Sequence, residues 1–136
     1  MTKVIGRLQE VSLPEFNLPS LTAKIDTGAY TSSLHCQIVS LAEEWVEFHV
    51  LDPSHPMYVD IPNRVSLVEM KHVTSSNGEA ELRPVIKTII KIGDEEFEIF
   101  LTLTDRSEMR YPILLGRRFL AEKYIVDVTG INLLGY

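Results

Sequence analysis

The sequence predicts an all-β, barrel-like domain with one short helix near its C-terminal end. Val and Ile dominate the apolar positions and the apolar runs are short, as is typical of strands. Several runs alternate apolar and polar residues, which is the pattern of half-buried strands. A convincing helical spacing of apolar residues occurs only in residues 116–124, "GRRFLAEKY". Short strands with a single helix favour a barrel-like all-β architecture.

The N-terminal part of the chain is predicted to form four strands. Alternation of apolar and polar residues is clearest in the third and fourth of them. They cover residues 3–13 with a break near Gly6, 21–26, 33–40 and 44–52. A loop punctuated by Pro53, Pro56 and Pro62 follows.

Two hairpins are predicted in the remainder of the chain. Strand-like runs at residues 65–73 and 81–92 flank Asn77-Gly78, and both turn residues tolerate positive φ. A second hairpin is expected to turn at Gly93-Asp94. Residues 111–120, "YPILLGRRFL", then form an apolar strand that runs into Gly-Arg and the helix.

Length and composition restrict the class of protein. A chain of 136 residues is long enough for one domain, expected to span residues 1–136, and 45% hydrophobic residues argue against disorder. The net charge of −6 argues against general nucleic-acid binding. No apolar run approaches the roughly 20 residues that span a bilayer, and the N-terminus has no apolar segment of signal-peptide length. We expect no nucleic-acid or membrane partner.

The only cysteine, Cys36, excludes an internal disulfide and predicts an intracellular, cytoplasmic protein. Cys36 follows His35 directly, so the two side chains point to opposite faces of a strand. That geometry does not suit a nucleophile and its base. The sequence also lacks the Gly-x-Ser-x-Gly elbow, so a serine or cysteine hydrolase is a poor interpretation.

The stretch "AKIDTGAYTSS", residues 23–33, contains the strongest candidate site. Asp26-Thr27-Gly28 follows a predicted strand and suits an ordinary turn, because Asp and Gly are favoured turn residues. The same residues suit half of an aspartic peptidase site. There, two carboxylates share one proton, because like charges about 3 Å apart cannot both ionise. Thr27 would hydrogen-bond across the pair, Gly28 would allow close backbone approach, and Ala29 would keep the cleft floor small.

Two distant segments favour the second interpretation. The "LLGR" in residues 111–120 resembles the retropepsin segment that packs under the Asp-Thr-Gly loop. The Asn-Gly hairpin lies between the two, where retropepsins carry the flap that covers bound peptide. By this resemblance Leu114, Leu115, Gly116 and Arg117 support the Asp loop, and Ser76, Asn77 and Gly78 contact substrate.

The resemblance extends over nearly the whole chain. The segments "LPEFNLPSLTAKIDTGAYTSSLHC", "VTSSNGEAELRPVI", "LTDRSEMRYPILLGRRFL" and "IVDV" look like the bacterial family catalogued as ATP-dependent zinc proteases. Members of that family are similar to RimB-type retropepsin-like peptidases, often encoded beside glutamate-ligating ATP-grasp enzymes. This implies a closed retropepsin-like β-barrel with one short C-terminal helix, acting as a dimeric aspartic peptidase on glutamate-rich or glutamylated peptide.

Residue 30 departs from the pattern of these families. Viral retropepsins have an Asp here that pairs with the arginine of Gly-Arg, and the bacterial family often has Arg after Asp-Thr-Gly-Ala. This chain has Tyr30, which cannot form that ion pair. The role of Arg117 is therefore left open by the sequence.

Neither zinc nor ATP has visible support in the residues. The sequence has no His-Glu-x-x-His, and no two of His35, His49, His55 and His72 form a helical i, i+4 pair. A phosphate loop of the Gly-x-x-x-x-Gly-Lys-Ser/Thr type is also missing. We expect no metal and no cofactor. A site assembled from distant residues, using His35 or His72, would instead make the chain a zinc-dependent peptidase.

Basic residues lie in or beside the motif segments, whereas acids concentrate at residues 42–44 and 93–98. These cations either read substrate carboxylates or form exposed charges and structural ion pairs. We take Arg83 and Arg106 as candidate substrate-binding residues and interpret Arg110 and Arg118 as structural. Ala29, Thr31 and Ser32 are further candidates for the substrate pocket.

The chain contains one Asp-Thr-Gly, and "DVTG" at residues 127–130 is not a second copy. A proton-sharing pair therefore requires a second Asp26 from another copy of the chain, related by a two-fold axis. We expect a homodimeric aspartic endopeptidase with an acidic peptide or protein substrate. The competing interpretation is a dimeric β-barrel that binds peptide without cutting it.

Overall fold

Strands account for nearly all of the regular structure in the chain. The computed structural model describes residues 2–74, 78–105 and 110–135, which contain eleven strands, one α-helix and one 3-10 turn. The strands are β1 (Lys3–Ile5), β2 (Leu8–Leu13), β3 (Leu18–Ile25), β4 (Ser32–Leu41), β5 (Trp45–Val50), β6 (Asn63–Ser66), β7 (Glu69–Thr74), β8 (Ala80–Ile92), β9 (Glu95–Thr104), β10 (Ile113–Leu115) and β11 (Tyr124–Val126). The 3-10 turn is Pro14–Phe16 and the helix α1 is Arg117–Leu120. Within the described ranges, no helix has the length and apolar character needed to cross a bilayer.

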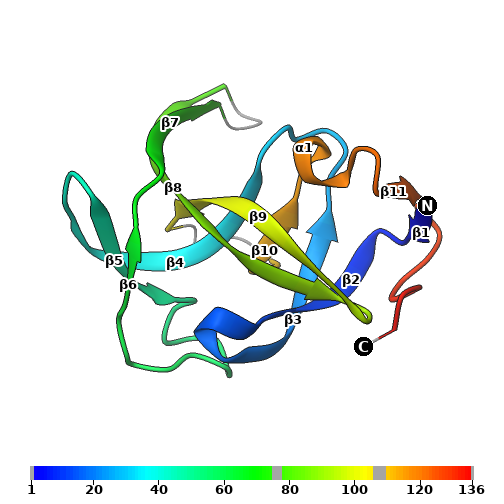
Figure 1. Cartoon of the computed structure of the whole chain (residues 1–136), viewed down its shortest axis with the longest axis horizontal. Helices are drawn as coiled ribbons and strands as arrows, with labels where there is room; N and C mark the ends of the chain where they lie inside the picture. The colour runs from blue at the N-terminus through cyan, green and yellow to red at the C-terminus, as the bar shows by residue number, and fades with distance from the viewer. Residues whose placement is uncertain (1, 75–77, 106–109, 136) are drawn as a thin grey trace.

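Six of these strands close into a barrel, which confirms the predicted fold class (Figure 1). Their order is β10-β3-β2-β8-β9-β4, and β4 pairs back onto β10. The short strand β10 is parallel to β3, with Leu115 opposite Ile25, and antiparallel to β4, with Ile113 opposite Leu34. It therefore lies between the strand that enters the Asp26 loop and the strand that leaves it.

Apolar side chains from the barrel strands fill the interior of the barrel. Alternate residues of β2 and β5 are buried, as the apolar–polar alternation predicts. Fully buried residues include Leu13, Leu34, Ile86, Leu101 and Leu115. Because interior and exterior positions alternate along a strand, this packing fixes which side chains face outward toward a site.

The strand pairs of both predicted hairpins are present. Strands β7 and β8 pair antiparallel as far as Thr74 opposite Ala80, and the turn predicted at Asn77-Gly78 lies partly outside the described residues, which omit 75–77. Strands β8 and β9 join through Gly93, whose φ of 63° lies in the left-handed region. Strands β5 and β6 extend the sheet outward from β4 (Figure 1).

The helix predicted over residues 116–124 is wrong in its length. It ends at Leu120, and Glu122 then adopts a φ of 69°, which turns the chain out of the helix. The following residues form β11, which pairs in parallel with β1 and buries Tyr124. Pairing with a distant strand therefore overrides the local helical pattern. The run predicted at residues 65–73 is likewise divided between β6 and β7.

Candidate functional site

Asp26 is the first residue after β3, and its loop is held by backbone hydrogen bonds. The Asp26 N–H donates to the Leu115 carbonyl at 2.9 Å. The Gly28 N–H donates to Oδ1 of Asp26 at 2.9 Å, and the Ala29 N–H donates to the Asp26 carbonyl at 3.3 Å. Asp26 is a half-buried residue, and the Gly28 N–H orients its carboxylate within the loop.

The Leu-Leu-Gly segment lies directly beside this loop. Leu115 is buried and receives the Asp26 hydrogen bond, while the Gly116 N–H donates to Oγ of Ser32 at 3.0 Å. A Cβ atom added at Gly116 would lie 2.4 Å from the Thr31 carbonyl oxygen. Only glycine therefore allows this close approach between β10 and the start of β4.

The structure gives Arg117 a definite position. Its backbone N–H donates to the Ala29 carbonyl at 2.8 Å, and its Nη1 donates to the Thr27 carbonyl at 3.0 Å. The guanidinium lies 5.8 Å from the centre of the Tyr30 ring. Arg117 thus contacts the Asp loop through two carbonyl groups and an aromatic ring, without the ion pair that an acidic residue 30 would offer.

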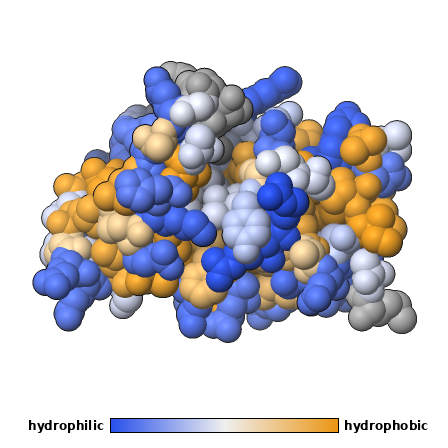
Figure 2. All heavy atoms as spheres, turned by 90° about the horizontal axis from the view of Figure 1, so that it is seen from above, coloured by the Kyte–Doolittle hydropathy of each residue, from blue (hydrophilic) through white to orange (hydrophobic). Residues whose placement is uncertain are grey.

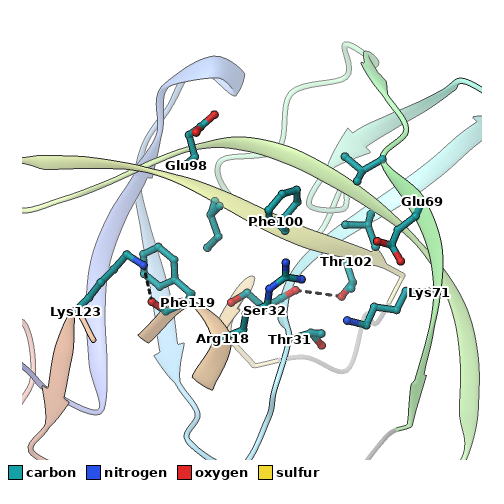
Figure 3. Close-up of a pocket in the computed structure, with 13 residues that line it drawn as sticks. Thr31, Ser32, Glu69, Lys71, Glu98, Phe100, Thr102, Arg118, Phe119 and Lys123 are labelled. Atoms are coloured by element: carbon teal, nitrogen blue, oxygen red, sulfur yellow. Dashed lines mark hydrogen bonds between the residues drawn. The ribbon is translucent and has the colours of Figure 1, made fainter. Parts of the chain in front are cut away.

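A cavity of about 320 Å³ opens beside the Asp loop, between the base of the β7–β8 hairpin and α1 (Figure 3). Its walls carry Thr31, Ser32, Val68, Glu69, Lys71, Val85, Glu98, Ile99, Phe100, Thr102, Arg118, Phe119 and Lys123. The hairpin and the Asp loop approach each other here: Nζ of Lys71, on β7, lies 5.5 Å from the centre of the Tyr30 ring. From above, hydrophilic side chains run across the middle of the surface with hydrophobic groups on both flanks (Figure 2).

The structure brings together some of the residues singled out in the sequence. Thr31 and Ser32 line the cavity, whereas Arg83 does not. The Arg83 side chain is 4% exposed and pairs with Glu81, at 3.3 Å between Nη2 and Oε2. Its role toward substrate stays a prediction. Gly78 is exposed at the end of the hairpin, and Ser76, Asn77 and Arg106 lie outside the described residues.

Among the described residues, three cations line the cavity, Lys71, Arg118 and Lys123, and none of them is among the substrate-binding residues that the sequence predicts. From the sequence, Arg118 is interpreted as structural, and Lys71 lies in a run predicted only as a strand. The sequence signal for Lys71 is its position in the run at residues 65–73, which is predicted as the first arm of the flap-like hairpin.

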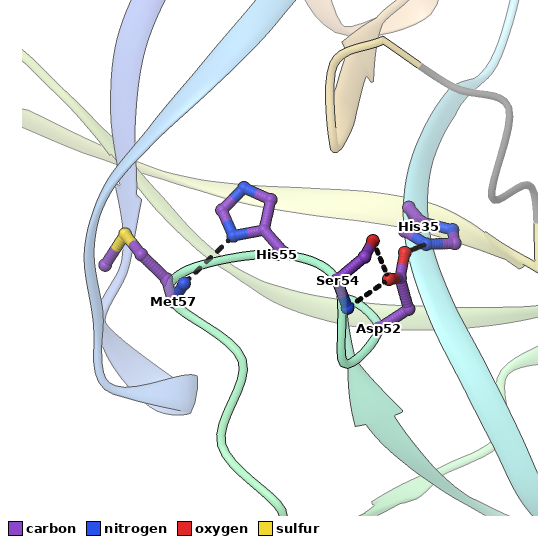
Figure 4. Close-up of polar contacts among 5 residues, drawn as sticks. All are labelled: His35, Asp52, Ser54, His55 and Met57. Carbon is purple, nitrogen blue, oxygen red and sulfur yellow. Dashed lines mark hydrogen bonds and ion pairs between the residues drawn. The ribbon is translucent and has the colours of Figure 1, made fainter.

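A second polar cluster joins the loop after β5 to the barrel (Figure 4). Nε2 of the buried His35 lies 2.6 Å from Oδ2 of Asp52, and the backbone N–H and hydroxyl of Ser54 donate to Oδ1 of Asp52. These hydrogen bonds, first from Ser54 and then from His35, lower the pKa of Asp52 to about 2. In a catalytic triad the imidazole sits between serine and carboxylate, whereas here the carboxylate is central. The cluster therefore fastens a loop and does not activate Ser54.

The donor groups of the described residues do not form a metal centre. Nowhere in the ranges 2–74, 78–105 and 110–135 do three His, Cys, Asp or Glu side chains gather into a possible ligand set. Burial raises the pKa of the Cys36 thiol to about 12, and the Asp105 charge adds to that rise. A thiol in that state is neither a good ligand nor a nucleophile. That the protein needs no metal stays a prediction.

The closed barrel, with β10 threaded between the two strands that flank an Asp-Thr-Gly loop, defines the retropepsin-like class of fold. The RimB-like family, described as "Retropepsin-like aspartic endopeptidase RimB", matches residues 4–132. The chain belongs to this family. The catalogue name of ATP-dependent zinc protease is not confirmed by the match.

Several relatives carry a different name. Proteins named "Probable alpha-L-glutamate ligase" from Shewanella pealeana, Desulfotalea psychrophila and Parasynechococcus marenigrum are 35%, 34% and 35% identical to this chain. The matches cover 97%, 92% and 97% of this chain, but only 30%, 28% and 29% of those proteins. The chain thus spans less than a third of the length of these curated relatives.

A solved structure supports the fold over the whole chain. The crystal structure of a protein of unknown function from Legionella pneumophila matches with a TM-score of 0.77 at 27% identity. The match covers 98% of this chain and 99% of that one. The barrel described above is therefore similar to an experimentally observed one along its full length.

Proposed function

We propose that this protein is a homodimeric aspartic endopeptidase that hydrolyses peptide bonds in glutamate-rich or glutamylated peptides. The observation that carries the proposal is the Asp26 loop. Its carboxylate accepts a hydrogen bond from the Gly28 N–H, and the Asp26 N–H donates to the Leu115 carbonyl of β10, which holds the loop against that strand. Membership of a family described as aspartic endopeptidases supports the same conclusion.

In the proposed mechanism, Asp26 residues from two copies face each other across a two-fold axis. One carboxyl is protonated and the other ionised, and the apparent pKa values belong to the pair. The ionised carboxylate takes a proton from water, whose oxygen attacks the scissile carbonyl carbon. The protonated carboxyl donates to the carbonyl oxygen. The carbon–nitrogen bond then breaks as the leaving nitrogen takes a proton from the pair, and Thr27 is proposed to hydrogen-bond across the dyad.

The substrate proposal depends on charge and on the names of the relatives. Lys71 and Arg118 reach the cavity beside the Asp loop, where they suit an acidic peptide. The matched relatives are named as glutamate ligases, and this chain matches less than a third of each. We infer that the reaction supplying the substrate is the ligation of glutamate to a peptide, and that this chain hydrolyses such products.

The decisive experiment compares Asp26→Asn with wild type on a glutamate-rich peptide, with products identified by mass spectrometry. The variant keeps the size of the side chain but cannot share a proton, so cleavage should fall by more than about a thousandfold. Wild type treated with EDTA should retain full activity. Asp94→Asn, in the exposed turn after β8, is the matched control and should cleave normally.

Other outcomes identify the competing functions. Activity that survives Asp26→Asn but disappears with EDTA would support a zinc-dependent peptidase. Wild type that binds the peptide but never cuts it would support a non-catalytic peptide-binding barrel. Circular dichroism of Asp26→Asn should match wild type, so that lost activity reports on chemistry and not on folding.

A further inference from the structure

We infer that the cavity beside the Asp loop is a substrate subsite that binds a peptide carboxylate between Lys71 and Arg118. This inference rests on the proposed peptidase function, because it assigns the cavity to the same substrate. The ligand is a carboxylate of an acidic peptide, either a glutamate side chain or a C-terminal carboxylate. Both present the same chemistry to the two cations.

The cavity lies within reach of a peptide at Asp26. Its wall begins at Thr31, in the same loop as Asp26, and the Arg118 N–H donates to the Tyr30 carbonyl at 3.0 Å. Lys71 approaches from the hairpin, with its Nζ 5.5 Å from the Tyr30 ring centre. An extended peptide that crosses Asp26 under this hairpin therefore places a neighbouring side chain at the cavity.

The two cations have no carboxylate partner among the described residues. Neither Lys71 nor Arg118 takes part in an ion pair there, whereas other surface cations do. Glu98 lines the cavity but pairs with Lys87 at 3.3 Å, and its carboxylate points away from Arg118 (Figure 3). Glu69 lies on the same wall as Lys71 without forming an ion pair with it. Positive charge at the cavity is thus left for a ligand.

The shape and lining of the cavity suit the stem of an acidic side chain. Cζ of Arg118 lies 5.0 Å from the centre of the Phe100 ring, and the buried Phe119 adds a second aromatic wall. A glutamate methylene stem can pack on these rings while its carboxylate meets the guanidinium in a bidentate contact. Because apolar walls reduce solvent screening, a charge pair here is stronger than one on an open surface.

The test measures peptide binding in the Asp26→Asn background, so that cleavage does not interfere. Three peptides of equal length are titrated by calorimetry: one with glutamates and an amidated C-terminus, one with glutamines and an amidated C-terminus, and one with glutamines and a free C-terminus. The cavity variant is Lys71→Gln with Arg118→Gln. The control removes the same two residue types elsewhere, as Arg64→Gln with Lys91→Gln, both exposed and outside the cavity.

If a glutamate side chain is the ligand, the cavity variant should weaken binding of the amidated glutamate peptide by about tenfold or more. The control should change it less than about twofold. The two glutamine peptides should bind weakly and equally. If the terminal carboxylate is the ligand, the loss appears instead with the free C-terminal peptide. Equal binding of all three peptides, or equal losses in both variants, would overturn the inference.

These outcomes separate the subsite from the peptidase function. Wild type that cleaves glutamate peptides while the cavity variant binds them normally leaves the proposed function standing and removes the subsite. Wild type that never cleaves, but whose binding of the glutamate peptide requires Lys71 and Arg118, would confirm the subsite and overturn the proposed peptidase function. Circular dichroism of each double variant distinguishes a lost contact from a lost fold.

Discussion

Gly116 shows how strongly a single residue constrains the candidate site. Its N–H donates to Oγ of Ser32, and an added Cβ would lie 2.4 Å from the Thr31 carbonyl oxygen. Its φ of −95° is open to any residue, so close packing and not backbone conformation excludes a side chain. The neighbouring backbone groups have little freedom to move, because β10 pairs on both sides.

We predict that Gly116→Ala destabilises the protein by about 1–3 kcal/mol, as overpacking does in well-packed interiors. Peptidase activity should fall further than stability explains, because the helix and the Asp loop must separate to admit the methyl group. Urea unfolding measures the first effect, and cleavage by the folded fraction measures the second. If the free energy of unfolding is unchanged from wild type, the backbone before β4 can move aside to admit the methyl group, and the prediction is wrong.

At the scale of elements, the loop between β5 and β6 depends on one carboxylate. Asp52 accepts hydrogen bonds from Ser54 and contacts His35 of β4, and these partners lower its pKa from 3.8 to about 2. A carboxyl whose pKa is lower in the folded state contributes stability above its ordinary pKa. That contribution is lost as the pH falls through the folded value, because the unfolded chain binds the proton first.

We therefore predict that wild type loses stability between about pH 4 and pH 2, in part through Asp52. Asp52→Asn should be less stable than wild type at pH 6, and the difference should shrink as the pH approaches 2. Urea midpoints at several pH values measure both effects. Asp60→Asn in the same loop is the control, since the Asp60 side chain is 84% exposed and its contacts, with Tyr58 and with His49 of β5, do not include His35 or β4. A difference that stays constant with pH would contradict the proposed fastening.

A second element-scale feature is the replacement of predicted helix by strand near the C-terminus. Residues 116–124 have a helical pattern, yet the chain leaves the helix after Leu120 and pairs β11 with β1. A short isolated helix is marginal in water, so the parallel pairing and the burial of Tyr124 decide the outcome. Phe119 of α1 and Tyr124 of β11 also contact each other, with 6.5 Å between their ring centres, so the end of the helix packs against the strand that follows it.

At the scale of the whole molecule, β1 and β11 carry apolar side chains on the surface. Val4 and Ile125 are opposite each other in register and are 46% and 62% exposed. Val128 and Ile131, which follow β11, are also exposed. Exposed apolar groups that lie side by side, as Val4 and Ile125 do, mark candidate association surfaces. We take this surface as the candidate contact for the proposed homodimer.

We predict that Ile125→Asp weakens self-association and that peptidase activity per chain falls on dilution. Analytical ultracentrifugation and cleavage rates over a range of concentrations measure the two effects. Val39→Asp, which alters an exposed apolar residue at the far end of β4, is the control. If Val39→Asp causes dissociation and Ile125→Asp does not, the dimer contact lies on the β4–β5 side and not at β1 and β11. Activity per chain that is independent of concentration would argue against a shared pair of Asp26 residues.

The sequence by itself determined the features that depend on neighbouring residues. Alternation identified the strands, Gly93 marked a hairpin, and Asp26-Thr27-Gly28 with Leu114-Leu115-Gly116 indicated the class of fold. Each of these signals acts over a few residues, through side-chain periodicity or allowed φ, and is visible without knowing the partners of a strand.

Only the tertiary structure decided the features that depend on register between distant strands. Lys71 and Arg118 meet across one cavity, whereas Arg83 is buried and pairs with Glu81, although all three are ordinary cations in the sequence. A shift of one residue would send each of the strand cations to the opposite face of its strand. Arg117 donates to the Thr27 carbonyl because α1 lies against the Asp loop, and the position of α1 does not follow from its local sequence. Pairing between distant strands decides where charged side chains lie. The sequence therefore predicted the Asp loop, which is local, but not the cavity beside it, which distant segments form.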